Sequence, residues 1–511
     1  MNILDNISIG LDTALSISNL TYCFFGVFLG TIIGVIPGIG ALAAISMLFP
    51  ITFHLAPSSA LIMLAGIWYG STYGGSTAAI LLNIPGTPST AVTALDGYPM
   101  SQNGQGGVAL LMTTIASFVG ASIGIILMML FAPLIAKYAL SFGSPEYFSL
   151  MVLGLIAAST ISDDSVAKGL AMVMLGIAFG TVGMDLYTGH ERFTLGFPEL
   201  SNGISIVALA MGIFGVSEII ASIQNIRKGQ IDRKSLTFRA MKPTRDDLRR
   251  SVIPMLRGSG IGSFFGTLPG TGPSVAAFLA YAIEKRYNTT PERFGKGAIE
   301  GIMAPESANN AADQTSFIPT MALGIPGSAT MALMLGALII HGITPGPQLM
   351  VEQADLFWGL VMSFWVGNIM LVLLNVPLIG LWVRLLLVPY HILYPAVLMF
   401  ICIGVYTVNN SSFDIWLVTF FGVLGYLMRV LRFPAAPLLL GFVLGPLMEE
   451  HFRRSMLISR GNFMTFFDRP ISGIILGFTL LLVLWSTLTA YRNWQKRTKL
   501  AASGQHSKTS V

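Results

Sequence analysis

The most polar stretch within the hydrophobic part of the chain is PESANNAADQ, residues 305–314. If this stretch is helical, four of its side chains share one face, because their spacing is i, i+3, i+4 and i+7: Glu306, Asn309, Asn310 and Asp313. A carboxylate inside a membrane is costly and is by default a functional candidate. We therefore predict that Asn309, Asn310 and Asp313 bind a cation, either Na⁺ or H⁺. The alternative is a solvated lip above the membrane, and Glu306, which follows Pro305, is expected in the first helical turn.

Four Pro-Gly clusters interrupt segments that are otherwise apolar. Proline removes a backbone donor and glycine permits positive φ angles, so a helix that reaches such a cluster ends there. Broken backbone at membrane depth is tolerated only where protein or a water-filled cavity surrounds it. The helix that follows each break presents free N–H groups, which attract an anion. The alternative is that each break is a plain kink or a surface turn.

Hydroxyl and amide side chains flank these breaks and can hydrogen-bond the oxygens of a substrate, although capping of the freed backbone is an equally available role. Four half-helix ends related by two-fold symmetry can hold a polycarboxylate without a buried arginine. The residues predicted to bind substrate are Pro37, Gly38, Gly40, Ser76, Thr77, Asn83, Pro85, Gly86, Thr87, Pro269, Gly270, Thr271, Gly272, Pro326, Gly327 and Ser328.

The composition explains why these breaks matter. Of the 511 residues 53% are apolar and only 10% are charged, against about 25% in a typical soluble domain. Soluble enzymes, secreted scaffolds and disordered proteins are therefore excluded. The net charge of +5 is no nucleic-acid signal, because ten of the 29 basic residues lie between Arg227 and Arg257. The composition predicts a polytopic all-α membrane protein.

Simple membrane spans are predicted from apolar runs of about 20 residues. The candidates are 107–136, 146–161, 166–187, 199–223, 356–387, 391–409, 412–431 and 470–491, with a short run at 433–447. The stretches 14–100 and 252–345 are apolar but interrupted, and each is predicted to contain a re-entrant hairpin, which makes about 11 spans plus two hairpins.

Lys and Arg mark cytoplasmic loops, so the 225–257 loop and the C-terminal tail are predicted to be cytoplasmic. The N-terminus, with no Lys or Arg before Lys137, is predicted to be external, whereas Arg453, Arg454 and Arg460 would also fall outside.

An internal repeat is visible in the glycines and prolines. GVFLGTIIGVIPGIG (26–40) matches GSGIGSFFGTLPGTG (258–272) at an offset of 232, and LNIPGTP (82–88) matches LGIPGSA (323–329) at an offset of 241. A third match pairs Phe197-Pro198 with Phe433-Pro434, each expected to open a late span. Because the two copies begin on opposite sides of the membrane, we predict inverted-topology repeats, as in secondary transporters. The glycines at 26, 30 and 34 are interpreted as helix-packing positions.

The predicted organisation has five parts: a first transmembrane repeat (1–224), a basic cytoplasmic loop (225–251), a second transmembrane repeat (252–452), a loop with the C-terminal transmembrane helix (453–491) and a cytoplasmic tail (492–511). Asp96, Asp163 and Asp164 are interpreted as loop residues. The six histidines have no metal-ligand spacing, and the chain lacks the sequence motifs of nucleotide hydrolysis or proteolysis. No organic cofactor, structural metal or enzymatic activity is expected.

Long motifs resemble the large membrane subunit of the tripartite tricarboxylate transporters, the TctA family. They are GVIPGIG, YGSTYGGSTAAILLNIPGTPST, DGYPM, GTLPGTGP, APESANNAADQTSFIPTMALGIPGSATMALMLGAL and HGITPGPQLM. The resemblance implies a multi-pass permease of the bacterial inner membrane. It also implies a small four-helix membrane partner, a periplasmic solute-binding protein, and import of citrate or other carboxylates driven by a cation gradient. A passive channel or gated pore for small anions is the alternative function, and an elevator-like movement of the hairpin-bearing unit is an extension of the first.

Overall fold

The structure is a computed structural model that describes residues 3–36, 40–139, 141–160, 166–185, 187–222, 240–268, 272–346, 348–386 and 390–502. The chain divides into two compact units, and neither unit is a continuous half of the sequence. Unit 1 comprises residues 1–141 and 197–428, and unit 2 comprises 142–196 and 429–511. Each unit therefore combines segments from both predicted repeats.

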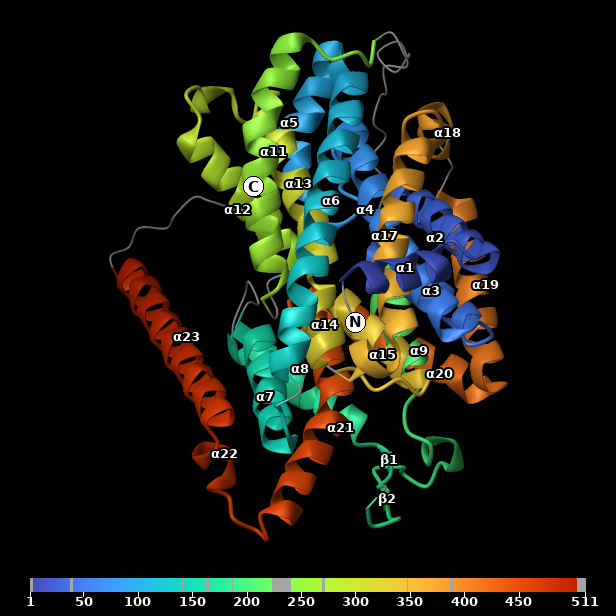
Figure 1. Cartoon of the computed structure of the whole chain (residues 1–511), viewed down its shortest axis with the longest axis vertical. Coiled ribbons are helices and arrows are strands. Elements are labelled where there is room, and N and C mark those ends of the chain that lie inside the picture. Colours follow the sequence, from blue (N-terminus) through green and yellow to red (C-terminus); the bar gives the residue numbers. More distant parts are fainter. Residues whose placement is uncertain are drawn as a thin grey trace. The chain divides into compact units, whose positions relative to one another are not determined.

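Unit 1 contains helices and connecting loops, and no strand, in the part that the structure describes (Figure 1). Its α-helices are α1 (Ile3–Ala14), α2 (Ile17–Val35), α3 (Ala41–Thr52), α4 (Pro57–Leu82), α5 (Ala91–Met100), α6 (Gly106–Ala139), α9 (Ile206–Ala210), α10 (Ser217–Ser222), α11 (Arg245–Gly266), α12 (Gly272–Tyr287), α13 (Glu300–Thr315), α14 (Phe317–Leu323), α15 (Ala329–Ile340), α16 (Leu349–Glu352), α17 (Ala354–Asn375), α18 (Ile379–Leu385), α19 (Tyr390–Asn409) and α20 (Ser412–Val430).

Unit 2 contains α7 (Ser144–Thr160), α8 (Val166–Gly180), α21 (Ala435–Ile458), α22 (Thr465–Asp468), α23 (Pro470–Ala502) and a two-residue antiparallel pair, β1 (Gly183–Met184) with β2 (Glu191–Arg192). Short 3₁₀ or π segments complete the two units at Pro88–Thr90, Ser101–Gln105, Pro198–Leu200, Met211–Val216 and Pro291–Arg293.

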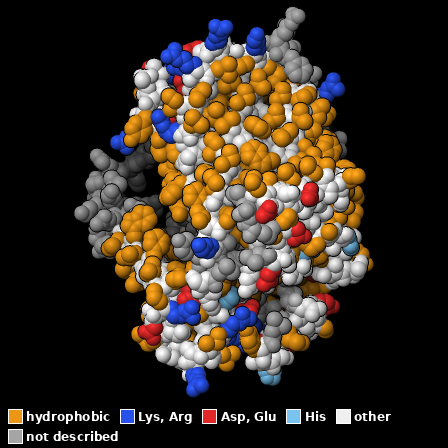
Figure 2. All heavy atoms as spheres, in the orientation of Figure 1, with side chains coloured by type: hydrophobic (Ala, Val, Ile, Leu, Met, Phe, Trp, Pro, Cys, Tyr) orange, Lys and Arg blue, Asp and Glu red, His pale blue; other side chains and the backbone are white. Residues whose placement is uncertain are grey.

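Among the described residues, five helical stretches are long and apolar enough to cross a membrane: Ile17–Val35, Pro88–Ile135, Ala354–Asn375, Ser412–Val430 and Pro470–Leu488. Six more apolar helices are shorter, including Ala41–Thr52 and Ala329–Ile340 beside the Pro-Gly breaks. Figure 2 shows hydrophobic side chains over much of the visible surface of unit 1, with Lys and Arg gathered at the end where α6 and α11 begin. These features are those of an all-α membrane protein with interrupted helices.

Several predicted boundaries differ from the observed ones. The predicted span 356–387 is divided between α17 and α18, and α21 extends well beyond the short run 433–447. Pro434 caps α21, but Pro198 opens only a three-residue 3₁₀ turn and the next α-helix begins at Ile206, so the third sequence match does not open two equivalent helices. The last residues of the predicted loop 225–251 are helical, because α11 begins at Arg245. The side chains of Thr244 and Asp247 form the capping box at its start.

A ladder of glycines joins α2 to α4. A Cβ atom on any of three glycines of α2 would overlap the backbone of α4, so the two helices touch directly. The pairs are Gly26 with Met63, Gly30 with Ile67, and Gly34 with Ser71. The packing role predicted for these glycines is thus confirmed. Because both residue numbers rise together, α2 and α4 run in the same direction, and the chain must return through the α3 segment between them.

The same ladder occurs between α11 and α13. Here the pairs are Gly258 with Ala304, Gly262 with Ala308, and Gly266 with Ala312. Each glycine is displaced by 232 from its counterpart in α2, and each partner is displaced by 241 from its counterpart in α4. Both offsets found in the sequence therefore recur in the contacts, and α11 also runs parallel to α13.

The two partner helices cross in opposite directions. Thr72 of α4 contacts Asp313 of α13, and Ser76 of α4 contacts Glu306, so rising numbers on one helix meet falling numbers on the other. Helices α4 and α13 are consequently antiparallel. Helix α6 also packs on α13, where Gly120 meets Ser307 and Gly124 meets Ala311 (Figure 1).

Asp96 is buried within α5 rather than placed in a loop, so that prediction was wrong. Its Oδ1 atom accepts four consecutive backbone N–H bonds at 2.8–3.1 Å, from Gly295, Lys296, Gly297 and Ala298. Its Oδ2 atom accepts a 2.9 Å bond from the hydroxyl of Tyr281. One carboxylate therefore fixes the connection between α12 and α13. Asp163 and Asp164 lie outside the described residues.

We expect Asp96→Asn to destabilise the protein by on the order of 3 kcal/mol, because hydrogen bonds to a charged acceptor are each worth more than neutral ones. Thermal unfolding of the purified protein in detergent measures this change. Glu292→Gln, at an exposed position of the same connection, is the control and should leave the melting temperature unchanged. An Asp96→Asn variant that melts with the wild type would contradict the role of this carboxylate.

Unit 2 contains the basic residues that conflicted with the predicted sidedness. Arg453 contacts Asp185 at 3.1 Å and Glu449 at 2.6 Å, and Arg454 contacts Glu450 at 2.7 Å. The backbone N–H of Tyr187, aided by Arg453, lowers the pKa of the Asp185 carboxyl below its usual value. Two of the three arginines are thus paired with neighbouring carboxylates.

The predicted sidedness can be tested with single cysteines placed at Ser8 and Lys242, both exposed in unit 1. Exposed Cys402 is first replaced by serine, whereas buried Cys23 is kept. In intact cells a membrane-impermeant thiol reagent should label Ser8→Cys, and it should label Lys242→Cys only after the membrane is opened, because Lys242 adjoins the most basic loop. Labelling of both positions from the same side would contradict opposite entry of α2 and α11.

Candidate functional site

The polar stretch 305–314 lies inside α13, and the side chains predicted to share a face are fully buried. Glu306, Asn309 and Asn310 have no exposed surface, and Asp313 is 1% exposed. The alternative of a solvated lip is therefore wrong. The expectation that Glu306 occupies the first turn is also wrong, because α13 begins at Glu300 and Pro305 lies within the helix.

Asp313 has one occupied and one free oxygen. Its Oδ2 atom accepts a 3.0 Å hydrogen bond from the Thr72 hydroxyl, whereas its Oδ1 atom is buried without a partner. Asn310 Oδ1 and Gln314 Oε1 are likewise buried without partners. A buried polar atom without a partner costs about 1–3 kcal/mol. Three such oxygens within five residues of one helix have the chemistry of an oxygen-ligand cation site.

Glu306 has a different environment. Its two oxygens accept hydrogen bonds from three hydroxyls: Ser76 Oγ at 2.9 Å, Thr93 Oγ1, and Ser117 Oγ at 3.3 Å. These donors come from α4, from α5 and from α6. The carboxylate of Glu306 is thus surrounded by hydroxyl donors, whereas Asp313 keeps an acceptor free.

The described residues that border the first break, and the second break itself, pack close to Ser71, the neighbour of Thr72 in the chain. Helix α2 ends just past Gly34, which touches Ser71. The second break reaches the same place, because a Cβ on Gly86 would overlap the carbonyl of Gly34 and Gly86 also borders Gly75. Gly40, at the start of α3, lies 3.7 Å from the carbonyl oxygen of Gly86, measured from the position of an added Cβ.

The described residues at the other two breaks repeat this arrangement around α13. Gly266 touches Ala312, and an added Cβ on Gly327 would lie 3.6 Å from the carbonyl oxygen of Gly266 and 3.9 Å from Ser316 Cβ. An added Cβ on Gly272, at the start of α12, would lie 3.8 Å from Ser328 Cβ. The start of α3 therefore packs on the break that precedes α5, and the start of α12 packs on the break that precedes α15.

The flanking hydroxyls mostly serve the backbone. Thr87 and Thr90 form a capping box at the helix start, and the Ser328 side chain accepts the N–H of Met331. Asn83 ends α4 in the left-handed conformation. Ser76 donates to Glu306, and Thr77 lines a small cavity beside it. Their predicted role in binding substrate stays a prediction.

Some of the predicted site cannot be compared with the structure. Pro37, Gly38, Pro269, Gly270 and Thr271 lie outside the described residues. Within the described ranges no group of three or more His, Cys, Asp or Glu side chains could hold a metal.

Several site residues were missed from the sequence: Thr93, Thr113, Thr114 and Ser117 near Glu306, and Asn368, whose side chain contacts Tyr73 and Ser122. Three of them could have been noticed in the sequence, because Thr113, Thr114 and Ser117 place three hydroxyl groups within about one turn of a largely apolar helix.

These observations define a helical membrane protein with Pro-Gly breaks between its helices and a buried carboxylate where α4 contacts α13. The chain belongs to the tripartite tricarboxylate transporter TctA family, whose sequence profile matches residues 20–440. It is therefore a subunit of a transporter of this class.

Two relatives come from Agrobacterium vitis. One, described as an uncharacterized 52.8 kDa protein in the TAR-I ttuC' 3' region, is 49% identical over 502 residues, which cover 98% of this chain and 99% of the relative. The other, described as an uncharacterized protein in the TAR-II ttuC' 3' region, is 51% identical over 232 residues, which cover 45% of this chain and 96% of the relative. No solved structure matches the chain.

Proposed function

We propose that the chain is the cation-coupled permease subunit that imports carboxylates such as citrate across the bacterial inner membrane. The observation that carries this proposal is that the described parts of the Pro-Gly breaks pack at the ends of α2 and α11, which touch Ser71 and Ala312, the neighbours of Thr72 and Asp313 in the chain. Each helix N-terminus carries partial positive charge, equivalent to about half an elementary charge. Together they favour the carboxylates of a substrate without any Lys or Arg.

The coupling cation is proposed to bind at Asp313, with Asn309 and Asn310 contributing. The free oxygens of Asp313, Asn310 and Gln314 support this assignment. Asn310 donates to the Asn309 side chain at 2.7 Å and to the Glu306 carbonyl at 3.0 Å, which leaves its own oxygen available. A cation at Asp313 attracts the substrate anion beside it, and this attraction is far stronger at low dielectric than in water.

Alternating access is proposed to arise from two inverted repeats. Two observations support it: the helix ladders match at both sequence offsets, and the equivalent helices α4 and α13 are antiparallel. In such transporters the substrate lies near the midplane, where the repeats meet. The contact between Thr72 and Asp313, which are 241 residues apart, would then lie on the two-fold axis.

The family is tripartite, and we propose that the other components are a small four-helix membrane subunit and a periplasmic solute-binding protein. The decisive experiment reconstitutes this chain with both partners in liposomes and measures uptake of labelled citrate and other carboxylates. Accumulation above the external concentration should require an inward Na⁺ or H⁺ gradient. Uptake that only equilibrates substrate, whatever gradient is imposed, would favour a passive pore.

A further inference from the structure

Unit 2 contains a hollow of about 400 Å³, a volume within the range of small-molecule sites. Its walls include the apolar side chains of Phe148 on α7, Ile177 on α8 and Phe452 on α21. Arg192 of β2 and Glu449 of α21 line the same hollow. All the residues that line it belong to unit 2, whereas Asp313 belongs to unit 1. The hollow is therefore distinct from the candidate site on α13.

Three helices reach the end of their apolar sequence at this hollow. Phe148 lies in the second turn of α7, and Ile177 lies in the last turn of α8. On α21, Met448 lines the hollow and is followed directly by Glu449 and Glu450. In a membrane protein, apolar sequence lies among the acyl chains and charged sequence lies among the headgroups. The hollow is thus placed at the depth where phospholipid headgroups join their acyl chains.

The charged side chains of the hollow are balanced in sign. The Nη1 atom of Arg192 donates to the two oxygens of Glu449 at 2.9 and 3.2 Å, whereas its Nε atom is buried without an acceptor. Arg453 contacts Glu449 at 2.6 Å and Asp185 at 3.1 Å. Two arginines are matched by two carboxylates, so this group of residues has no surplus of positive charge.

The rim of the hollow has an unusual backbone conformation. Phe193 lines the hollow, is 67% exposed, and has a φ angle of +54°. A bulky residue rarely adopts this left-handed conformation, and such outliers cluster at ligand-binding sites. A ligand in the hollow would cover this exposed ring.

We propose that this hollow binds one phospholipid with a phosphoethanolamine headgroup. The phosphate accepts hydrogen bonds from the guanidinium of Arg192, whose planar donors match phosphate oxygens. The ammonium group donates to Glu449, and an acyl chain packs on the apolar walls formed by Phe148, Ile177 and Phe452. This site is additional to the proposed transport function and does not depend on it.

The chemistry of the hollow favours this headgroup over others. Anionic lipids bind where basic residues are in surplus, and here the arginines are matched by carboxylates. A choline headgroup has no N–H group, so it cannot donate a hydrogen bond to Glu449, whereas an ammonium group has three donors. A soluble phosphate ester would leave the apolar walls in water and forgo the free energy of burying them.

Native mass spectrometry on the purified full-length chain, with one lipid added at a time, tests the headgroup. The wild type should bind phosphatidylethanolamine at least about tenfold more tightly than phosphatidylcholine or phosphatidylglycerol with the same acyl chains, because hydrogen bonds to charged groups have about this effect on affinity. Glycerophosphoethanolamine, the headgroup without acyl chains, should not bind at the same concentration. Equal affinity for all the lipids, or equal affinity for the soluble headgroup, would overturn the proposal.

Three variants test the assigned contacts. Arg192→Gln should lower the affinity for phosphatidylethanolamine by at least about tenfold, because it removes the charged donor to the phosphate. Arg454→Gln is the matched control, since Arg454 pairs with Glu450 and does not line the hollow, and it should bind the lipid as the wild type does. Glu449→Gln should shift the preference toward phosphatidylglycerol, because Arg192 and Arg453 then lose the carboxylate that they share. Unchanged affinity in Arg192→Gln, or an unchanged preference in Glu449→Gln, would contradict these contacts.

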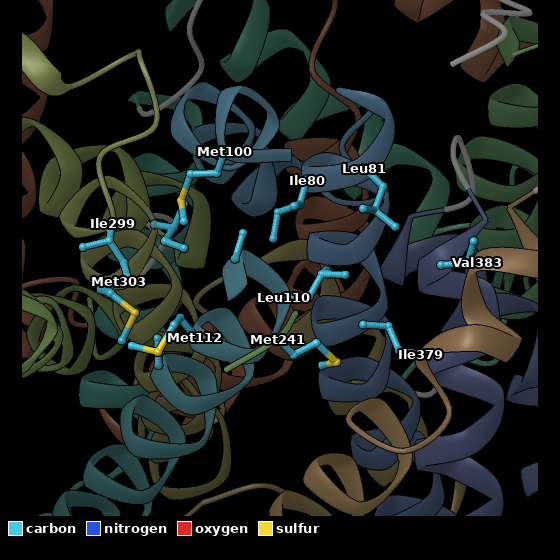
Figure 3. Close-up of a cluster of buried hydrophobic side chains, with 13 residues drawn as sticks. Ile80, Leu81, Met100, Leu110, Met112, Met241, Ile299, Met303, Ile379 and Val383 are labelled. Atoms are coloured by element: carbon cyan, nitrogen blue, oxygen red, sulfur yellow. The ribbon is translucent and has the colours of Figure 1, made fainter. Parts of the chain in front are cut away.

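A substitution elsewhere separates lipid binding from general stability. Figure 3 shows a buried apolar cluster of unit 1 that includes Val383 of α18. Val383→Ala should lower the melting temperature, because it removes buried methyl groups, and should leave the affinity for phosphatidylethanolamine unchanged. A loss of affinity as large as that in Arg192→Gln would mean that lipid binding follows the stability of the chain, and it would overturn the site. None of these measurements involves uptake, so failure of the transport proposal would leave them to be judged separately.

Discussion

Asp313→Asn should abolish gradient-driven accumulation of substrate and leave at most exchange of internal for external substrate. Asparagine keeps the size of the side chain and can still accept the hydroxyl of Thr72, but it removes the negative charge of the carboxylate that Thr72 contacts. Allosteric coupling energies of 1–3 kcal/mol correspond to about 5–150-fold changes in affinity. Loss of this coupling should therefore lower uptake at limiting substrate by up to about 100-fold. Proteoliposome uptake with an imposed Na⁺ or H⁺ gradient measures the effect.

Asp355→Asn is the matched control, because Asp355 is an exposed acid at the start of α17. It should accumulate substrate as the wild type does. Thermal unfolding of both variants separates loss of coupling from loss of folding. If Asp313→Asn accumulates substrate with unchanged cation dependence, Asp313 is not the coupling residue.

Gly262→Ala should prevent stable packing of α11 on α13, because its new Cβ would overlap the carbonyl oxygen of Ala308. The overlap involves backbone, so no side chain can rotate away to relieve it. Overpacking costs about 1–3 kcal/mol where neighbours can shift, and we expect the upper end of this range or more. The yield of monodisperse protein and its melting temperature in detergent measure the loss.

The same helix supplies the control for this change. An added Cβ on Gly260 would meet no atom within 4 Å, so Gly260→Ala should be neutral or stabilising by up to about 1 kcal/mol, as expected for alanine replacing glycine in a helix. The two substitutions are chemically identical and two positions apart. Equal melting temperatures would contradict the direct helix contact.

Much of the fold could be predicted because its causes are local. Apolar runs predicted the positions of α6, α7, α19 and α20 to within a few residues, and they predicted the start of α23 at residue 470. The Gly-xxx-Gly spacing predicted close helix packing, and the i, i+3, i+4, i+7 spacing placed Glu306 and Asp313 on one buried helix. Each of these patterns involves residues within one helix, which are close together in the sequence, so the sequence alone is enough to predict them.

The environment of the two carboxylates could not be predicted, because it depends on which helices meet. Ser76, Thr93 and Ser117 are far apart in the chain, and each is an ordinary residue within an apolar segment. From its position after Pro305, Glu306 was expected in the first helical turn and was not assigned to the cation site, unlike Asp313. In the structure its carboxylate is instead surrounded by hydroxyls from three other helices. Asp96 was missed for the same reason, because its partners lie about 200 residues later.

The division into two compact units also could not be predicted from local sequence patterns. Two consecutive repeats predict two consecutive domains, yet α21 packs on α7 and α8 of the first half. Glycines again explain the contact, since Gly176 of α8 meets Leu438 and Gly441 of α21 meets Val173. Their positions in the sequence do not reveal which helix they face.

The contact between Thr72 and Asp313 has a consequence for the history of the protein, on the inverted-repeat proposal. In a dimer of two identical chains, equivalent residues that touch on the two-fold axis must be of the same type. Two aspartates there would place two carboxylates in buried contact, and two threonines would leave no charge. A single carboxylate on the axis therefore requires two copies joined in one chain, so that one position can change alone. Because the two copies then differ at their meeting point, the inward-facing and outward-facing states need not have equal energy, and this one pair of residues can set which state the empty carrier prefers.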